Sequence, residues 1–308
     1  MTATVSQPTT KEAVALQTHD LTRDQSHDQT PCRSVEQPLL LPFTDLRCRQ
    51  VELAGGKGAS LASMTAEGLP VPPGFVVTAA AFAAAVDQEV LRAAMRRKDV
   101  DAARALVAAA EAPRELITAA FGELTGLVAV RSSACAEDSE GASYAGQQET
   151  FLNTDGIEDV LHNVVECWLS FFTHRAIFYR QEKGSLEDVD IAVVIQQMVD
   201  SQKSGVMFTI DPVHGRKDRM VIEAARGLGE AVVSGEVTPD NYTLSRGGEV
   251  KKSKVVHEKR VLTDEECAAL AEMGRILAEL HGGPQDIEWA FEAESTLFLL
   301  QSRPITTI

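Results

Sequence analysis

The segment from Gln285 to Pro304 constrains the fold more than any other part of the chain, because it has the pattern of a β-hairpin with two unlike faces. Its halves, 285–292 and 297–304, both alternate polar and apolar residues, which is the period of a strand. The four residues between the halves suit a short hairpin connection. The segment therefore predicts one apolar face that enters a core and one polar face that stays accessible.

The polar face of this hairpin carries groups that suit a metal-bound phosphate. We expect Glu292 to face Leu297, and this register forms two polar cross-strand pairs: Glu288 with Gln301, and Asp286 with Arg303. The opposite face then carries the apolar residues Ile287, Trp289, Phe291, Phe298 and Leu300. Carboxylate and amide oxygens suit Mg²⁺, and a neighbouring arginine suits a phosphate. The pattern indicates a metal–nucleotide site, but it also fits an ordinary half-exposed hairpin with cross-strand pairs.

The charge of the chain excludes several classes of partner. Lys plus Arg total 29 against 45 Asp plus Glu, so the formal net charge is −16. Such a surface repels nucleic acid and anionic membranes. No apolar run approaches the length of a membrane span. We therefore expect no nucleic-acid partner and no membrane, and a substrate such as ATP requires a local basic pocket with metal ions.

The cysteines and the first residues favour a cytoplasmic protein. The five cysteines are odd in number and form no C-x-x-C pair, so we expect free thiols in a reducing compartment. The N-terminus lacks a signal-peptide core, and Asp20, Asp24 and Asp28 argue against a transit peptide.

The pattern along the chain predicts an α+β protein in three parts. Residues 1–38 are polar without apolar periodicity, which favours a disordered extension. Residues 39–185 are rich in helical patterns, notably 79–121, broken by a proline, and one long amphipathic helix at 155–181. Residues 186–308 are rich in strands. This shift predicts a helix-rich lobe and a strand-rich lobe with a cleft between them.

Two features of the first lobe are typical of phosphate contact. The motif Gly55-Gly56-Lys57-Gly58 combines a cation with glycines that let backbone N–H groups approach a phosphate, before a predicted helix. It is not a Walker A loop, and most such tetrapeptides are plain turns. Arg131 ends a strand predicted at 127–130, and small residues at 141–148 suit a lid over phosphates. A solvated loop with a structural arginine is the alternative.

Gln197, Met198 and Val199 end a predicted strand of β-branched residues. Such a strand end offers backbone N–H and C=O groups to an adenine edge, and the two apolar side chains suit its face. Core packing is the more common role of such residues. The segment 223–230 is either a second ligand loop or a strand-to-loop transition. No H-x-x-x-H, H-E-x-x-H or G-x-S-x-G motif occurs, so hydrolysis by a nucleophilic triad is unsupported.

Together and in this order, the motifs resemble the N-terminal nucleotide-binding region of the dikinase family. That family includes pyruvate phosphate dikinase, phosphoenolpyruvate synthase and rifampin phosphotransferase. The matching segments are spread over nearly all of the chain after residue 41: 55–61, 68–77, 130–133 with 136–138 and 144–147, 204–209 with Pro212, and 285–289 with 301–305.

The resemblance implies an ATP-grasp fold, in which two lobes clamp ATP and Mg²⁺. It implies that three cations contact the ATP phosphates and act in catalysis: Lys57, Arg131 and Arg303. Two residues would lie beside the phosphates under the lid: Gly146 and Thr150. Three would frame the adenine: Gln197, Met198 and Val199. Two would bind Mg²⁺: Glu288 and Gln301. Family members split ATP to AMP, moving a pyrophosphoryl group to a histidine and then a phosphoryl group onward.

The chain departs from the family pattern at two points. Cys135 stands where relatives usually carry a threonine, and no swivelling phosphohistidine domain or acceptor domain follows Arg303-Pro304. The resemblance therefore implies a phosphotransferase component whose acceptor lies on a separate phosphohistidine-domain protein or acceptor-binding subunit. Two alternatives stay open: a self-sufficient small-molecule kinase or ATP-grasp ligase, and a non-catalytic ATP-binding module.

Overall fold

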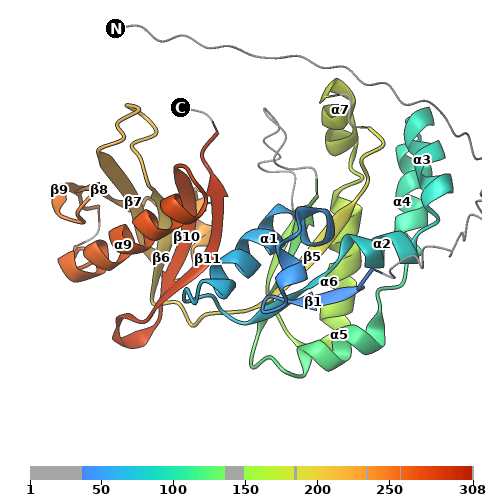
Figure 1. Cartoon of the computed structure of the whole chain (residues 1–308), viewed down its shortest axis with the longest axis horizontal. Coiled ribbons are helices and arrows are strands. Elements are labelled where there is room, and N and C mark those ends of the chain that lie inside the picture. Colours follow the sequence, from blue (N-terminus) through green and yellow to red (C-terminus); the bar gives the residue numbers. More distant parts are fainter. Residues whose placement is uncertain (1–36, 136–148, 184–185, 234, 257, 307–308) are drawn as a thin grey trace, which may run out of the picture. The chain divides into compact units, whose positions relative to one another are not determined.

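Two antiparallel sheets organise the chain in the computed structural model (Figure 1). The structure describes the following residues: 37–135, 149–183, 186–233, 235–256 and 258–306. Nearly all of the predicted N-terminal extension at 1–38 and all of the predicted lid at 141–148 lie outside these ranges. Within them, one sheet has five strands and the other has six.

The first sheet has the strand order β1-β2-β5-β3-β4, and its central strands are buried on both faces. Its strands are β1 (Leu40–Pro42), β2 (Gly74–Val77), β3 (Val128–Ala134), β4 (Thr150–Thr154) and β5 (Ile191–Gln197). All seven residues of β3 are buried. Strands covered on both sides read as short apolar runs and not as alternation, which is the pattern that predicted them.

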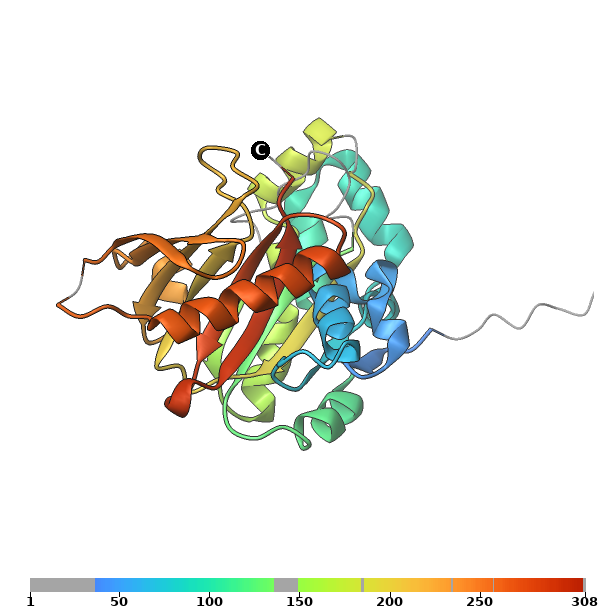
Figure 2. The ribbon, with the colours of Figure 1, turned by 60° about the vertical axis from the view of Figure 1, so that its left-hand side comes forward.

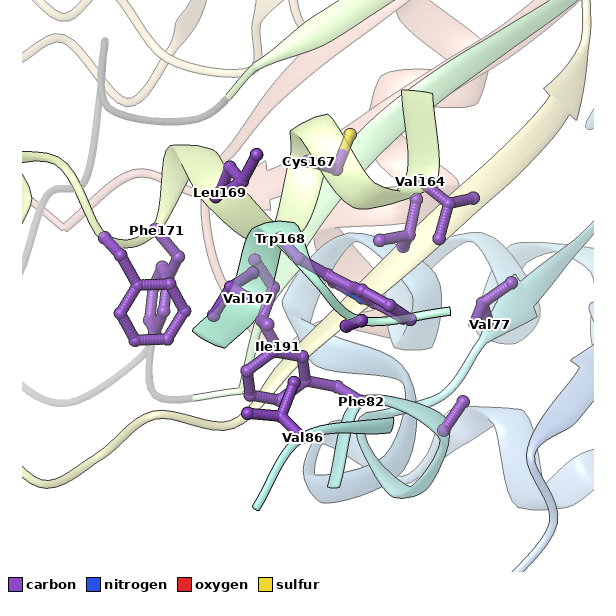
Figure 3. Packing of buried hydrophobic residues seen from close by; sticks show 14 of the residues in the cluster. Val77, Phe82, Val86, Val107, Val164, Cys167, Trp168, Leu169, Phe171 and Ile191 are labelled. Atoms are coloured by element: carbon purple, nitrogen blue, oxygen red, sulfur yellow. The ribbon is translucent and has the colours of Figure 1, made fainter. Parts of the chain in front are cut away.

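Helices cover this sheet on both sides. They are α1 (Val51–Ala66), α2 (Ala79–Ala85), α3 (Gln88–Arg97), α4 (Val100–Ala108), α5 (Arg114–Phe121), α6 (Gly156–Ser170) and α7 (His174–Lys183), and a 3₁₀ turn (Leu46–Arg49) precedes α1. On one side, Trp168 of α6 packs edge-on against Phe82 of α2, with ring centroids 5.5 Å apart (Figure 3). On the other side, Val76 and Val194 share a core with Leu61 of α1.

The helical stretches are shorter than predicted. Between 79 and 121 the chain stops and restarts several times, because Asp87 and Asp99 cap new helices by accepting hydrogen bonds from backbone N–H groups. The predicted helix at 155–181 likewise divides into α6 and α7. The apolar stripe continued across these breaks, so periodicity alone did not reveal them.

The second sheet has the order β11-β10-β6-β7-β8-β9. Its strands are β6 (Lys203–Phe208), β7 (Arg219–Arg226), β8 (Asp240–Ser245), β9 (Val250–Lys254), β10 (Gln285–Phe291) and β11 (Leu297–Pro304). The short helix α8 (Glu230–Val233) follows β7. The long helix α9 (Asp264–Leu280) crosses one face of the sheet (Figure 2). A capping box between Thr263 and Glu266 fixes the start of α9.

The predicted α+β class, with a helix-rich first part and a strand-rich second part, is confirmed. The predicted lobe boundary at 185 falls before β5, although β5 pairs with β2 and β3 in the first sheet. Sheet membership changes only between Gln197 and Lys203. Among the helices that the structure describes, none is long and apolar enough to cross a bilayer.

Candidate functional site

The β10–β11 hairpin brings the predicted polar residues together on one face. Both predicted pairs are present: Glu288 with Gln301, and Asp286 with Arg303. In the second pair, the Arg303 guanidinium donates to the Asp286 carboxylate, with Nε and Nη2 at 2.8 and 2.7 Å from Oδ2. Residues directly opposite each other in an antiparallel pair share a face. The ladder therefore places two acids, an amide and a cation side by side.

The turn of this hairpin is out of the predicted register by one residue. Phe291, and not Glu292, lies opposite Leu297. A 3₁₀ turn (Ala293–Ser295) fills the connection, and the Glu292 N–H donates to the Thr296 carbonyl at 3.0 Å. The predicted turn is therefore wrong, yet the pairs further along the strands are correct.

A β-bulge at Leu300 reconciles the two registers. On one side of it Glu288 pairs with Gln301, and on the other side Trp289 pairs with Leu299. Leu300 is the extra residue between these pairs and has no partner in the ladder. An inserted residue of this kind changes no polar–apolar boundary in the sequence, but it shifts every later pairing by one.

The bulge also corrects the predicted core face of β11. Leu299 is fully buried, whereas the two residues predicted to be in the core, Phe298 and Leu300, are only half-buried. The core residues predicted on β10 are confirmed as buried: Ile287, Trp289 and Phe291.

Arg131 of β3 joins the first sheet to this hairpin. Its Nη2 donates to Gln301 Oε1 at 2.7 Å and to Glu288 Oε2 at 2.8 Å, while Nη1 donates to the Leu300 carbonyl oxygen at 3.2 Å. Arg131 is 9% exposed, and hydrogen bonds to charged groups are strong in such surroundings. Its Nε is buried and has no hydrogen-bond partner among the described residues. The guanidinium thus has a donor left for a ligand.

The glycine motif lies against the same strand. Lys57 Nζ donates to the Ser132 carbonyl oxygen at 2.9 Å. α1 kinks at Gly55, where φ is +67°, and a Cβ at this position would lie 2.3 Å from the Ser133 carbonyl oxygen. Only glycine allows both the left-handed backbone and this approach to β3. The motif therefore holds Lys57 beside the residue that follows Arg131.

The residues predicted to frame an adenine donate two of their backbone N–H groups within the protein. The Gln197 and Met198 N–H groups donate to the carbonyls of Pro73 and Leu127, each at 2.9 Å. Val199 is buried. These bonds fix the segment between the two sheets, and an adenine contact there stays a prediction.

Thr150, predicted beside the phosphates, is the first residue of β4 and is the ladder partner of Arg131. It lines a cavity of about 470 Å³ that also brings in Glu230 of α8. The other predicted residue of this pair, Gly146, lies outside the described residues.

The polar residues of the hairpin face continue onto β7 and β8, which the sequence alone did not predict. Across the second sheet, Glu288 lies opposite Val206 of β6, which lies opposite Glu223 of β7, which in turn lies opposite Asn241 of β8. Asn241 Nδ2 donates to Glu223 Oε1 at 3.4 Å. We call the face of the second sheet that carries Asp286, Glu288, Gln301, Arg303, Glu223 and Asn241 the polar face. Alternation in β7 and β8 was the available signal, but it did not show which strands were neighbours.

Two ionisable groups near the site have shifted pKa values. Burial raises the pKa of Asp286, and the adjacent Arg303 guanidinium opposes this shift. Burial, with the nearby Asp190 carboxylate, raises the pKa of the Cys135 thiol to about 12. A thiol with a raised pKa is mostly protonated at neutral pH, which favours a packed side chain over a nucleophile at Cys135.

The family model described as "Pyruvate phosphate dikinase, AMP/ATP-binding domain" matches residues 51–261 and 245–308 of the chain. These ranges include every candidate residue considered above.

Curated relatives match most of this chain. It is 44% identical to the "Probable phosphoenolpyruvate synthase" of Methanothermobacter thermautotrophicus, and the match covers 86% of this chain and 46% of that protein. It is 37% identical to the "Phosphoenolpyruvate synthase" of Pyrococcus furiosus, over 86% and 43%. It is 35% identical to the "Rifampicin phosphotransferase" of Bacillus subtilis, over 88% and 36%. The chain therefore spans less than half the length of these relatives.

Solved structures similar to this chain include an ADP complex of N5-carboxyaminoimidazole ribonucleotide synthetase, at 12% identity and a TM-score of 0.34, over 80% of this chain and 47% of that one. They also include the ATP-grasp ligase PsnB with a precursor peptide and AMPPNP, at 12% identity and a TM-score of 0.31, over 81% and 50%.

Proposed function

The chain belongs to the family of the pyruvate phosphate dikinase AMP/ATP-binding domain, and on this premise we propose that it binds ATP with Mg²⁺ and donates the pyrophosphoryl group with release of AMP. One phosphoryl group then passes onward and the other leaves as phosphate. The acceptor is a histidine or a substrate on a separate domain or protein. The relatives include proteins named for phosphoenolpyruvate synthesis and for rifampicin phosphorylation, so the final acceptor differs within the group.

The observation that carries this proposal is the meeting of Arg131 with Glu288 and Gln301. These residues come from two sheets and lie 157 and 170 positions apart in the sequence. A chain folded only for stability has little use for a nearly buried guanidinium bonded to a carboxylate, an amide and a released carbonyl, because each group must be desolvated. The arrangement suits a ligand that carries both negative charge and a metal.

The donor set fits Mg²⁺ bound to a nucleotide. Glu288 and Gln301 supply hard oxygens, and Mg²⁺ typically takes one or two protein carboxylates and completes its shell with water and phosphate oxygens. Across the described ranges, no group of three or more His, Cys, Asp or Glu side chains is arranged to hold a metal ion, which favours a metal that arrives with phosphate ligands. The unpartnered Arg131 Nε offers a donor to such a phosphate. When bound, Mg²⁺ would neutralise charge on the phosphate oxygens.

The chain's own residues would contribute position and charge. Lys57, Arg131 and Arg303 supply three cations around the hairpin, from α1, β3 and β11. Phosphoryl transfer asks little covalent chemistry of the protein, so fixed cations aligned on the transferring group account for most of the catalysis. Gln197, Met198 and Val199 hold the adenine in this proposal, and Thr150 of β4 contacts the phosphates. Gly146, which lies outside the described residues, is proposed to contact them as well.

We also propose a reducing compartment, the cytosol. The cysteines in the described residues carry free thiols: Cys48, Cys135, Cys167 and Cys267. Burial raises the pKa of each thiol, which suits packed side chains in a protein that does not depend on disulfides.

Phosphorus NMR tests the proposed reaction. The chain is mixed with ATP and Mg²⁺, alone and with candidate phosphohistidine-domain proteins, and the products are followed over time. AMP that appears only with an acceptor supports the proposal. ADP as the product would assign the chain to direct kinases or ligases, and ATP binding without any turnover across all acceptors would assign it to nucleotide-binding modules.

A further inference from the structure

Arg131 occupies the oxygens that the proposed function assigns to the metal. Its Nη2 lies 2.7 Å from Gln301 Oε1 and 2.8 Å from Glu288 Oε2, which are hydrogen-bond distances to both groups at once. A divalent ion bound to the same two oxygens would lie against this positive charge. The guanidinium and the metal therefore compete for one pair of ligands.

The bulge at Leu300 anchors the guanidinium in this position. Because Leu300 has no ladder partner, its carbonyl is available to Arg131 Nη1, at 3.2 Å. Glu288 keeps 29% of its side chain exposed, whereas the Arg131 side chain keeps only 11%. The cation is thus the more deeply buried member of the pair, and the carboxylate stays partly accessible to solvent.

A triphosphate would give Arg131 a better partner. The Arg131 Nε is buried without an acceptor, although Nη1 and Nη2 are both bonded. Guanidinium groups prefer bidentate contact with phosphate, through two adjacent N–H groups. A phosphate that engages this donor draws the positive charge from Glu288 and Gln301, and frees their oxygens.

We propose that Arg131 is a resident counter-ion that keeps divalent metal off Glu288 and Gln301 until a nucleotide arrives. The inference rests on the proposed Mg²⁺–ATP function and adds an order to it: free metal binds poorly, and metal binds well only with a nucleotide. The Leu300 carbonyl is the positioning group that makes this exchange possible.

The test measures Mn²⁺ binding to the nucleotide-free chain by the EPR signal of the free ion. In Arg131→Gln, the carboxylate loses its counter-charge, so Mn²⁺ affinity should rise about tenfold or more over the wild type, in keeping with the loss of one close ion pair at intermediate dielectric. The double variant Arg131→Gln/Glu288→Gln should lose this gain. Equal Mn²⁺ affinity in the wild type and Arg131→Gln would overturn the proposal.

Arg303→Gln is the matched control, because it removes the same charge beside the polar face, but the cation that it removes pairs with Asp286 and not with Glu288. We expect a smaller gain in Mn²⁺ affinity than in Arg131→Gln. An equal gain would mean that net charge, and not the Arg131 contact, controls the metal, and would also overturn the proposal.

A second measurement needs no variant and remains valid if Arg131→Gln does not fold. Calorimetry on the wild type should give weak binding of Mn²⁺ alone. Mn²⁺ binding to the chain with equimolar ATP should be at least about tenfold tighter than Mn²⁺ binding to the same concentration of ATP without protein, the range of typical coupling energies between sites. Equal affinities would refute the ordered exchange while leaving ATP binding intact. A wild type that binds no ATP with or without metal would instead refute the proposed function.

Discussion

The two sheets of this chain are both antiparallel but differ in what covers them. β5 in the first sheet is buried along nearly its whole length, with apolar residues packed on both faces. β10 in the second sheet alternates buried and half-buried residues along most of its length, with α9 over one face and the polar face on the other. The first sheet therefore has little surface to spare, and the second carries most of the candidate site.

One residue of the first sheet departs from this apolar pattern. Arg131 is the one charged side chain within the described central strands of the first sheet, and it is the group that reaches across to the polar face. A buried strand makes a rigid support because its backbone is bonded on both sides. The geometry suggests a division of work, in which the first sheet holds a cation in place and the second presents the oxygens.

The largest effect should come from the apolar core that packs on the first sheet. Trp168→Ala removes a fully buried indole that packs on Phe82, and we expect a loss of about 3–5 kcal/mol in the free energy of unfolding. Urea denaturation followed by circular dichroism measures this. The control is Leu116→Ala on α5, where the side chain is 46% exposed. A loss no larger than that of the control would show that the core around Trp168 does not dominate the stability of the chain.

The polar face should respond in activity more than in stability. Glu288→Gln should lower ATP turnover by about 10²–10³-fold, as when a group that fixes transition-state charge is removed, while unfolding changes less than in Trp168→Ala. The control is Glu223→Gln, which removes the same charge from the same row two strands away. Equal losses of turnover in both variants would show that the whole face, and not the hairpin, supports the reaction.

A glycine at the junction of α1 and β3 gives an intermediate effect. Gly55→Ala should destabilise the chain by about 1–3 kcal/mol, because the residue combines a left-handed backbone with a close approach. It should also weaken ATP binding, since Lys57 follows two residues later. Gly68→Ala is the control, because φ there is +70° with open space around the Cβ position. Similar losses in the two variants would mean that backbone strain, and not contact with β3, makes glycine necessary.

The smallest effect concerns the start of α9, on the covered side of the second sheet. Burial raises the pKa of Glu266, but hydrogen bonds from Lys203, the Thr263 N–H and Ser295 outweigh it, so the pKa lies below its usual value of 4.5. The folded state therefore binds this proton less readily than the unfolded state. The resulting stability is present above pH 4.5 and is lost as pH falls through the folded pKa.

Urea denaturation at a series of pH values measures this contribution. Glu266→Gln should flatten the decline of stability below pH 4.5. Glu265→Gln, at the exposed neighbouring position in α9, should leave the decline as in the wild type. A wild-type curve with the same slope as Glu266→Gln would remove Glu266 from the groups that link folding to pH.

Much of the fold followed from local pattern. The hairpin and the dikinase resemblance, which the family match confirms, were predicted from short stretches of residues. The strand predicted at 127–130 was too short, because β3 continues to Ala134 and holds Arg131 in its interior. The helix breaks near Asp87 and Asp99 were missed, because a capping aspartate looks like any polar residue until the preceding helix is known to stop. Leu300 was missed because a bulge leaves the composition of a strand unchanged.

The sequence by itself determined which side chains share a face on β10 and on the part of β11 beyond the bulge at Leu300, because alternation in a regular strand is fixed by backbone geometry. Glu288 with Gln301, and Asp286 with Arg303, were therefore predictable from 20 residues alone. Only the tertiary structure decided that Arg131 meets them and that the Leu300 carbonyl receives it. Those contacts join residues more than 150 positions apart. The helix α1 packs against β3 and β5 of the first sheet and against β11 of the second, and this packing, not any local pattern, brings Arg131 to the hairpin.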